Sequence, residues 1–202
     1  MGLKSSDFIQ TGLSSLPPPV GVGFWSGYAA VLVPLVNYGE NYSLLLTRRA
    51  EHLSQHPGEV AFPGGMWEEG DHFPTGTALR EAQEEAAIPP ESVQLLGSLP
   101  PLTTRRGTQV TPVVGIIPRE TQFVASPDEI DTIFSVPLVD LVPDNRVRTD
   151  VFSRISNQHW APAYDYQGYE IWGFTAAVIK MLLERCFQTP FVREHSAPEK
   201  FW

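Results

Sequence analysis

The chain has 202 residues, of which 42% are hydrophobic, so we expect one domain with a single core. Its formal net charge of −9 and pI near 5.0 argue against binding to nucleic-acid backbones. No apolar run approaches the roughly 18 residues that cross a bilayer. A single cysteine, Cys186, excludes an intrachain disulfide and suits a reducing compartment. We therefore expect a cytoplasmic protein without a membrane or nucleic-acid partner, and the sequence indicates no particular oligomeric state.

Residues 1–26 are expected to form an N-terminal arm and linker. The segment Ser14–Pro19 ends in three consecutive prolines, which neither continue a helix nor enter a central strand, so it is expected to be extended. The domain itself is expected over residues 27–187. Residues 188–202 form a polar tail that we expect to be loosely ordered.

Two strands open the domain. Tyr28–Val36 is a nearly continuous apolar run bounded by turn residues, which is typical of a buried strand, and Pro34 indicates a bulge or an edge position. Tyr42–Thr47 follows a polar turn and is predicted to be the paired second strand. Arg48 and Arg49 come directly after it. At a strand end either arginine can contact a phosphate, with a solvated hairpin exit as the alternative.

A glycine pair and a helix come next. Gly64 and Gly65 lack a Cβ atom and therefore let the backbone approach another group closely, although a tight turn also favours glycine. A helix is predicted from about Ala78 to Ala87, because two prolines follow shortly after and end it. Thr75 or Thr77 is the predicted N-terminal cap.

Three glutamates share one face of this predicted helix. Glu81, Glu84 and Glu85 stand at positions i, i+3 and i+4, which are neighbours at 3.6 residues per turn. Like charges at this spacing repel by about 0.2–0.5 kcal/mol per pair, and a merely solvated helix usually alternates signs. Mg²⁺ is held by a few carboxylate oxygens, waters and substrate phosphates. The acidic face is therefore predicted to bind a divalent cation.

The remainder of the chain is predicted to be mixed α/β structure. The basic turn at Arg105 is a candidate phosphate contact in an acidic protein, with a solvated turn as the alternative. Glu129 is a candidate for reaching a metal or a water from a loop, with a surface carboxylate as the alternative. Strands are predicted at Val93–Leu99, Thr111–Ile117, Val151–Ile155 and Tyr169–Trp172, a short helix at Pro137–Val142, and a packing helix at Gly173–Phe187.

The stretch Arg80–Ile88, REAQEEAAI, resembles the second half of the Nudix hydrolase signature, G-x5-E-x7-R-E-U-x-E-E-x-G-U, where U is apolar. Ala87 stands where glycine is usual. The first half of the signature fits with one extra residue. Glu68, Glu69 and Asp71 therefore all remain candidates for the acid that braces the arginine in this family.

The residues before the helix resemble the upstream motif of the coenzyme A pyrophosphatase branch, L-L-T-x-R-(S/A)-x3-R-x3-G-x3-F-P-G-G. Ser54 departs from that motif, which usually has arginine there. The resemblance implies an α/β fold, a Nudix-type α/β/α sandwich with a mixed β-sheet, for residues 27–187. The matching residues are Leu45, Leu46, Thr47, Arg49, Ala50, Gly58, Phe62, Pro63, Gly64 and Gly65.

By this resemblance the chain is expected to be a metal-dependent pyrophosphatase. It would cleave coenzyme A or an acyl-CoA into 3′,5′-ADP and 4′-phosphopantetheine or its acyl form, with Mg²⁺ or Mn²⁺ as cofactor and a CoA-like nucleotide as its partner. Glu81 and Glu85 are the expected metal ligands, with Glu84 completing the shell directly or through water. Glu84 or Glu129 would take the proton of the attacking water, and Arg80 would orient the glutamates.

Two alternatives remain open. A Nudix pyrophosphatase for another nucleoside diphosphate, such as ADP-ribose, is compatible with Ser54. A non-catalytic nucleotide-sensing module would keep the fold without turnover, and the intact glutamate trio argues against it. The expected substrate contacts are Arg48, Arg49, Gly64, Gly65 and Arg105.

Overall fold

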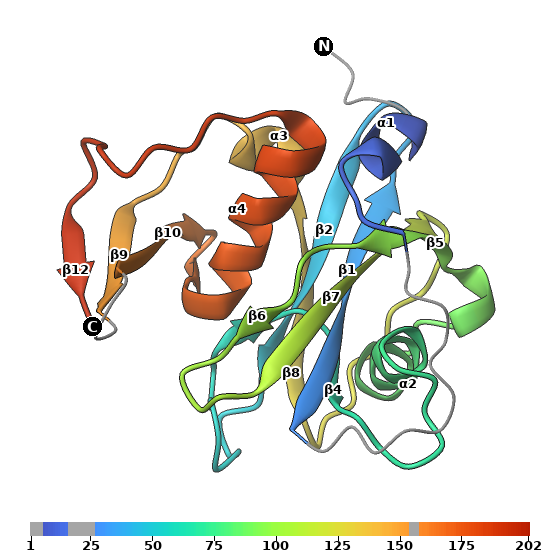
Figure 1. The fold of residues 1–202 in the computed structure, drawn as a ribbon. Coiled ribbons are helices and arrows are strands. Elements are labelled where there is room, and N and C mark those ends of the chain that lie inside the picture. Colours follow the sequence, from blue (N-terminus) through green and yellow to red (C-terminus); the bar gives the residue numbers. More distant parts are fainter. Residues whose placement is uncertain (1–5, 16–26, 154–157) are drawn as a thin grey trace.

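The computed structural model describes residues 6–15, 27–153 and 158–202. Over these residues a mixed β-sheet is covered by a helix on each face, with a smaller sheet beside the last helix (Figure 1). The predicted α/β/α sandwich is confirmed. The elements in chain order are α1 (Ser6–Thr11), β1 (Tyr28–Asn37), β2 (Tyr42–Arg49), β3 (Val60–Ala61), β4 (Gly64–Met66), α2 (Thr75–Ala86), η1 (Pro90–Ser92), β5 (Gln94–Ser98), β6 (Leu102–Thr103), β7 (Gln109–Pro118), β8 (Ile130–Pro137), α3 (Leu138–Leu141), β9 (Arg148–Ser153), β10 (Gln158–Tyr166), β11 (Tyr169–Ile171), α4 (Gly173–Phe187) and β12 (Glu199–Phe201).

The main sheet is mixed because its two central strands run parallel while their neighbours run antiparallel. Within the described residues the order is β3-β2-β1-β7-β5, with β4 beside β1, β6 beside β7 and β8 beside β2. The parallel ladder of β1 and β7 runs from the pair Tyr28 and Gln109 to the pair Asn37 and Pro118. On its other side β1 pairs first with β4 and then with β2. This change of partner brings the two glycines of β4 to the centre of the sheet.

Pro34 lies in a central strand, so the prediction of an edge position is wrong. It stands opposite Gly115 of β7 and falls where β1 changes partner. The N–H of Leu32 donates to the carbonyl of Pro63 at 2.8 Å, and the ladder with β2 begins at Leu35. A proline is tolerated between these two positions because the ladder is interrupted there and needs no N–H.

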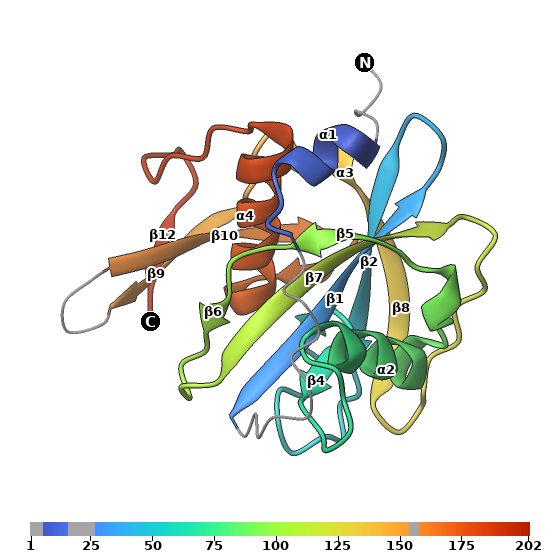
Figure 2. The same ribbon diagram turned by 45° about the vertical axis from the view of Figure 1, so that its right-hand side comes forward.

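The central strands alternate between two hydrophobic cores, one on each face of the sheet. Figure 2 shows α2 and α4 on opposite sides of these strands. Fully burying one Val, Leu or Ile side chain contributes about 1.5–3 kcal/mol, so both helices are held mainly by this packing. The core under α2 includes Ala30, Leu32, Val36, Leu45, Val113 and Ile117. The core under α4 includes Val33, Leu35, Leu44, Leu46, Val114 and Ile116.

The N-terminal residues 6–15 pack onto the domain. Helix α1 contacts α4 and β5, and Ile9 is fully buried in the core under α4. Ser14 pairs with Ser98 in an isolated bridge. The three prolines of the predicted extended segment lie outside the described residues.

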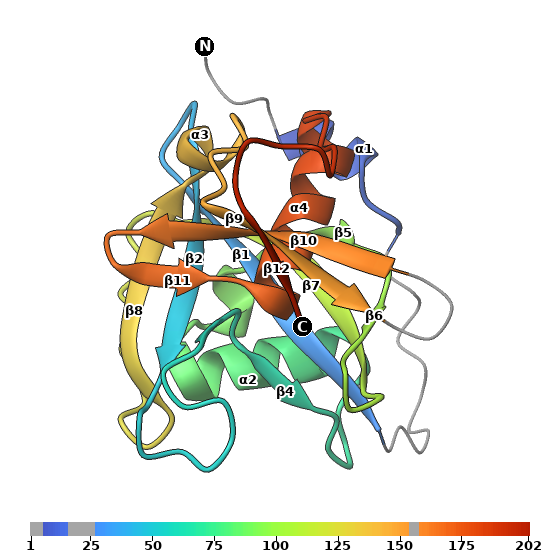
Figure 3. The same cartoon turned by 90° about the vertical axis from the view of Figure 1, so that its left-hand side faces the viewer.

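The smaller sheet has the order β11-β10-β9-β12, and its last strand corrects the prediction for the tail. β12 pairs in parallel with β9 (Figure 3). The Trp202 ring stacks on Trp172 and Phe152, with centroid distances of 4.6 and 6.4 Å. The prediction of a loosely ordered tail is therefore wrong for residues 199–202, because two long-range interactions hold them.

The other predicted elements differ in how closely they match. Helix α4 begins and ends as predicted, and β1, β2, β5, β7 and β11 agree within a few residues. The predicted strand near Val151 begins earlier, at Arg148. β8 and β10 are additions that the sequence did not predict. None of the described helices is long and apolar enough to span a membrane.

Candidate active site

Helix α2 carries the three glutamates. It begins at Thr75, directly after Pro74, and no side chain caps its first turn, so the prediction of a threonine cap is wrong. Thr77 is instead fully buried beneath the helix. The face that packs on the sheet is formed by small side chains, which let the helix lie close to it: Ala78, Ala82 and Ala86, all fully buried.

The helix ends in a left-handed residue, Ala87, with φ 53° and ψ 35°. Its N–H donates to the carbonyl of Gln83 at 3.0 Å, and the N–H of Ile88 donates to the carbonyl of Ala82 at 3.2 Å. The first of these bonds is the 5→1 bond of an αL helix end. A left-handed conformation costs a residue with a Cβ about 1–2 kcal/mol, which explains why glycine is favoured at this position. The predicted end of the helix is confirmed.

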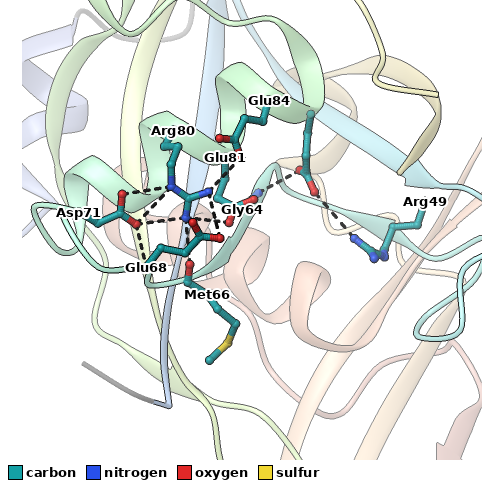
Figure 4. Close-up of polar contacts among 9 residues, drawn as sticks. Arg49, Gly64, Met66, Glu68, Asp71, Arg80, Glu81 and Glu84 are labelled. Carbon is teal, nitrogen blue, oxygen red and sulfur yellow. Dashed lines mark hydrogen bonds and ion pairs between the residues drawn. The ribbon is translucent and has the colours of Figure 1, made fainter. Parts of the chain in front are cut away.

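The three glutamates share a face but differ in exposure. The exposed side-chain fraction is 14% for Glu81, 58% for Glu84 and 4% for Glu85. Glu85 accepts a hydrogen bond from the N–H of Gly64 at 3.1 Å, and its other oxygen lies 3.8 Å from Nη1 of Arg49 (Figure 4). The buried carboxylate thus connects the helix to β4 and to the end of β2.

Burial raises the pKa of the Glu85 carboxyl to about 8, from an ordinary value near 4.5. The hydrogen bond from Gly64 and the charge of Arg49 oppose this rise, whereas the charges of Glu81 and Glu129 add to it. Burial also raises the pKa of Glu81. Burial thus disfavours ionisation of two neighbouring carboxyls, and the chain's own cations and donors do not fully offset this effect.

Arg80 is the centre of the polar network beside these glutamates (Figure 4). Its Nε and Nη2 donate to the Asp71 carboxylate at 3.1–3.3 Å. Nη2 also donates to the carbonyl of Met66 at 3.1 Å and lies 3.0 Å from Oε1 of Glu81. Nη1 donates to Glu84 at 2.9 Å. The arginine therefore fixes two of the three glutamates relative to the loop before the helix.

Asp71 is the acid that braces Arg80, which the sequence had left open among three residues. The Asp71 side chain is 10% exposed, whereas Glu68 is 69% exposed and reaches Arg80 only at 3.9 Å. Burial opposes the ionisation of Asp71, but the hydrogen bonds from Arg80 and from the N–H of Glu68 hold its pKa below its ordinary value near 3.8. The carbonyl of Met66 completes the bracing. Because this acceptor is a main-chain group, the pattern of side chains in the sequence could not reveal it.

Gly64 and Gly65 are needed because other parts of the chain approach them closely. A Cβ on Gly64 would lie 2.5–2.7 Å from atoms of Ala30 and Val31 in β1. A Cβ on Gly65 would overlap the carboxylate of Glu81. The glycines therefore allow β4 to lie against the central strand and the glutamates to lie against β4. Their predicted contact with substrate remains a prediction.

The structure brings Arg49 to the glutamates but not Arg48. Neighbouring residues of a strand point to opposite sides, so only one of the two can face the helix. Arg48 donates to Asp131 at 2.7 Å and also pairs with Glu51. Its guanidinium is thus already engaged by two carboxylates away from the site.

Glu129 lies near the glutamates, whereas no contact places Arg105 at the site. Glu129 precedes β8, and its charge adds to the effect of burial in raising the pKa of both Glu81 and Glu85. Its carbonyl accepts a hydrogen bond from the N–H of Ala50 at 2.8 Å. Arg105 is exposed in the turn between β6 and β7, and no described contact joins it to the glutamates.

The chemistry of these donors fits a hard divalent cation. Carboxylate oxygens are preferred ligands of Mg²⁺ and Mn²⁺, and a bound cation would favour the ionised form of Glu81 and Glu85, which burial disfavours. Within the described parts of the chain, no group of three or more acidic, histidine or cysteine side chains is placed to hold a metal ion. An ion held here would need waters or substrate oxygens besides the glutamates, and Mg²⁺ accepts such ligands.

Comparisons with known proteins agree with this fold and site. A family model described as the NUDIX domain matches residues 28–162. The uncharacterized Nudix hydrolase NudL of Enterobacter sp. (strain 638) is 46% identical over 154 residues, which cover 76% of this chain and 80% of the relative. NudL of Pectobacterium atrosepticum, also described as uncharacterized, is 44% identical over 177 residues, which cover 88% of this chain and 92% of the relative.

The fold is also similar to that of a solved structure. The crystal structure of the Nudix hydrolase RenU from M. smegmatis has a TM-score of 0.55 with 20% sequence identity, covering 82% of this chain and 89% of RenU. At this identity the likeness concerns the fold alone. The family model and the NudL relatives together cover most of the sheet and the whole of helix α2. The chain therefore belongs to the Nudix hydrolases, enzymes that hydrolyse a pyrophosphate bond.

Proposed function

We propose that this Nudix hydrolase cleaves the diphosphate bond of coenzyme A or of an acyl-CoA, releasing 3′,5′-ADP and 4′-phosphopantetheine or its acyl form. One observation carries the proposal: residues of the upstream motif converge on the glutamates. Arg49 and the N–H of Gly64 reach Glu85, and Gly65 leaves room for Glu81. The motif that distinguishes the coenzyme A pyrophosphatase branch is thus in contact with the residues proposed to perform the chemistry.

Nudix hydrolases generally use divalent cations, and Mg²⁺ or Mn²⁺ is the proposed cofactor. Glu81 and Glu85 would hold the ion, with Glu84 completing the shell directly or through water. When bound, such an ion neutralises the diphosphate and lowers the pKa of a water molecule. Burial, which raises the pKa of both Glu81 and Glu85, would be opposed by a positive charge between them.

Arg49 is the residue proposed to contact the diphosphate. Its side chain is 25% exposed, and its Nε has no hydrogen-bond partner within the described residues. The distance of 3.8 Å to Glu85 leaves the guanidinium only loosely paired. The buried Nε is not accessible to a substrate, but the loosely paired end of the guanidinium can contact phosphate oxygens, which arginine binds through charge-assisted hydrogen bonds.

The hydrolysis joins a water oxygen to one phosphorus and breaks the bond from that phosphorus to the bridging oxygen, which leaves with the second phosphate. A carboxylate must accept the proton of the water. We favour Glu129 as this base. Arg80 holds Glu84 at 2.9 Å, whereas no cation among the described residues forms an ion pair with Glu129. Arg80 positions Glu81 and Glu84 and has no proposed contact with the reacting atoms.

The experiment that tests the proposal compares substrates. The purified enzyme is given coenzyme A, acetyl-CoA or ADP-ribose, each in Mg²⁺ and in Mn²⁺, and the products are identified by mass spectrometry. We expect 3′,5′-ADP from both CoA substrates and slower turnover of ADP-ribose. A strong preference for ADP-ribose would reject the substrate assignment in favour of the alternative that Ser54 keeps open. Turnover of none of the three in either ion would favour the nucleotide-sensing module.

The choice of base is tested separately with Glu129→Gln and Glu84→Gln. Replacing the base removes the group whose deprotonation activates the water, so the acidic limb of the pH profile of kcat should disappear in that variant alone. We expect this change for Glu129→Gln. Its appearance in Glu84→Gln instead would assign the role to Glu84.

A further inference from the structure

The loop between β2 and β3, residues 50–59, lies directly beside the proposed catalytic residues. Its first residue, Ala50, donates its N–H to the carbonyl of Glu129 at 2.8 Å. The His52 ring nitrogen Nε2 lies 3.1 Å from the carbonyl of Asp128. The residue just before the loop is Arg49, which faces Glu85. The β2–β3 loop is therefore held at one side against the segment that carries the proposed base.

At its tip the same loop contacts a basic turn that is distant in sequence. Nη1 of Arg106 donates to the side-chain oxygen of Gln55 at 2.5 Å. Arg105 and Arg106 lie in the turn between β6 and β7, which hydrogen bonds between Thr104 and Thr108 close at 2.9 and 3.2 Å. Figures 1 and 3 show the loop and the turn at the same end of the main sheet as β4. The turn thus contacts the tip of the same loop whose base adjoins Arg49 and Glu129.

The charges of the nearby arginines show which of them are available to a further anion. Arg80 is engaged by Asp71, Glu81 and Glu84, and Arg48 by Asp131 and Glu51. Arg49 is the cation proposed for the diphosphate.

Arg105 and Arg106 differ from these arginines in their partners. The one described partner of Arg106 is the amide of Gln55, which is neutral, so the hydrogen bond orients the guanidinium without cancelling its charge. Arg105 and Arg106 are both exposed. In a protein with a net charge of −9, two adjacent arginines without a described acidic partner are unusual.

We propose that the Arg105–Arg106 turn binds a phosphate monoester that the substrate carries in addition to its diphosphate, with Gln55 holding Arg106 in position. Guanidinium groups bind phosphate oxygens with two parallel hydrogen bonds, and an exposed pair in one turn offers several donors to one phosphate. The inference rests on the proposed function. In coenzyme A the additional group is the 3′-phosphate of the ribose.

The test measures kcat/KM for coenzyme A and for dephospho-coenzyme A, which lacks the 3′-phosphate, and takes their ratio. We expect the wild-type enzyme to favour coenzyme A by about tenfold or more, as charge-assisted hydrogen bonds to one phosphate imply. The double variant Arg105→Gln and Arg106→Gln should lower the ratio to near one, mainly through KM for coenzyme A. Gln55→Ala should lower it by a smaller factor, because Arg106 keeps its charge and loses only its orientation.

The matched control is Arg119→Gln. Arg119 follows the other end of β7, is 65% exposed and pairs with Glu120, so its loss removes the same charge without touching the turn. It should leave the ratio at the wild-type value. Both arginines of the turn are exposed, so thermal melting of the double variant should match the wild type.

The outcomes of these measurements distinguish failure of the phosphate site from failure of the proposed function. Equal kcat/KM for the two substrates in the wild type, or an equal loss for both in the double variant, would overturn the phosphate site and leave the proposed function in place. Failure of the wild type to cleave either substrate would overturn the proposed function, and this inference with it. If Arg119→Gln also lowers the ratio of the two kcat/KM values to near one, the effect comes from overall charge, and the proposed phosphate site is overturned.

Discussion

Two regions of the molecule differ in how well their buried charges are paired. In the proposed active site the carboxylates outnumber the cations. Glu85 is almost fully buried, yet its nearest arginine lies 3.8 Å away and burial raises its pKa to about 8. Near the smaller sheet, by contrast, Arg146 has a fully buried side chain with every group engaged. It donates twice to Asp144, at 3.0 and 2.6 Å, and also to Thr149 and to the carbonyl of Val192.

The difference separates a group kept for stability from one kept for function. Around Arg146 each donor has an acceptor, so the cluster fixes the strand β9 and the C-terminal segment relative to each other. Around Glu85 the imbalance costs folding free energy, and a chain built for stability alone would replace one of the glutamates. Under the proposed function, this imbalance serves to bind a cation and an anionic substrate. The following predictions test this contrast, from the largest expected effect to the smallest.

Arg146→Met should destabilise the fold strongly. The substitution leaves Asp144 and Thr149 without their buried donor, and breaking a buried pair in this way costs about 3–5 kcal/mol. Denaturant unfolding measures the loss. The control is Arg193→Met, which breaks the exposed pair with Glu199 and should cost less than about 1 kcal/mol. Equal losses in the two variants would contradict the structural role of the buried cluster.

Glu85→Gln should instead reduce activity and leave stability unchanged. Glutamine has the same size and still accepts the hydrogen bond from Gly64, but it removes the charge of a proposed metal ligand. We expect kcat to fall at least tenfold, which is about 1.4 kcal/mol or more, with no loss of unfolding free energy. Glu91→Gln, on the exposed turn after the helix, is the matched control and should leave kcat unchanged. Wild-type turnover in Glu85→Gln would reject the assignment of Glu85 as a ligand.

The pH dependence of stability should report the same imbalance in the presence of a chelator. Glu85 has a pKa of about 8 in the folded protein and near 4.5 when unfolded, so the folded state binds more protons between these values. Its contribution is fully present below about pH 4.5 and is lost as the pH rises through about 8. The expected slope is up to about 1.4 kcal/mol per pH unit.

The groups that face Glu85 set this slope. They are Glu81 and Glu129, which favour the protonated form, and Arg49 and the N–H of Gly64, which oppose it. Chemical denaturation at pH 5, 6, 7 and 8 in EDTA measures the effect, and Glu85→Gln serves as the reference. A wild-type slope equal to that of the variant would show that Glu85 titrates normally. Excess Mn²⁺ should raise the stability most at the alkaline end, because it binds the ionised carboxylate.

Ala87→Gly should stabilise the protein slightly without changing the site charges. Glycine adopts the left-handed conformation at φ 53° without the steric cost of a Cβ, and part of the gain is offset by the greater freedom of the unfolded chain. We expect a gain of about 0.5–1 kcal/mol in the free energy of unfolding. Ala86→Gly, one residue earlier in the helix and fully buried, should lose about 1 kcal/mol or more. The prediction is checked by the free energy of unfolding, which should rise in Ala87→Gly and fall in Ala86→Gly.

The fold was largely predictable because its central elements carry strong local signals. β1, β2, β5 and β7 are apolar runs, and α4 has an apolar helical period that ends where the structure ends it. β12 was not predictable, because three residues with polar neighbours form a strand only through parallel pairing with β9. β10 was not predicted either, although it contains several aromatic residues. In the structure Tyr164 is buried in the core under α4.

The site was predictable in its residue types and less so in its geometry. Spacing placed the glutamates on one face, but only the sheet decides that Glu85 is buried and Glu84 exposed. Strand alternation implies that only one of Arg48 and Arg49 faces the helix, without saying which. The contact between Arg106 and Gln55 joins residues far apart in the sequence, and no spacing rule would reveal it.

Because β1 pairs with other strands on both of its sides, its position in the sheet affects when the chain can fold during synthesis. At Ala29 this strand is bonded to Met66 on one side and to Val110 on the other, so its partners come from well downstream. Contacts between distant segments slow folding, and a ribosome delivers them only after much of the chain has emerged. Helix α2, which carries the glutamates, packs on β1. We therefore expect nascent chains that end before β7 to lack catalytic activity and to expose apolar strands that chaperones can bind.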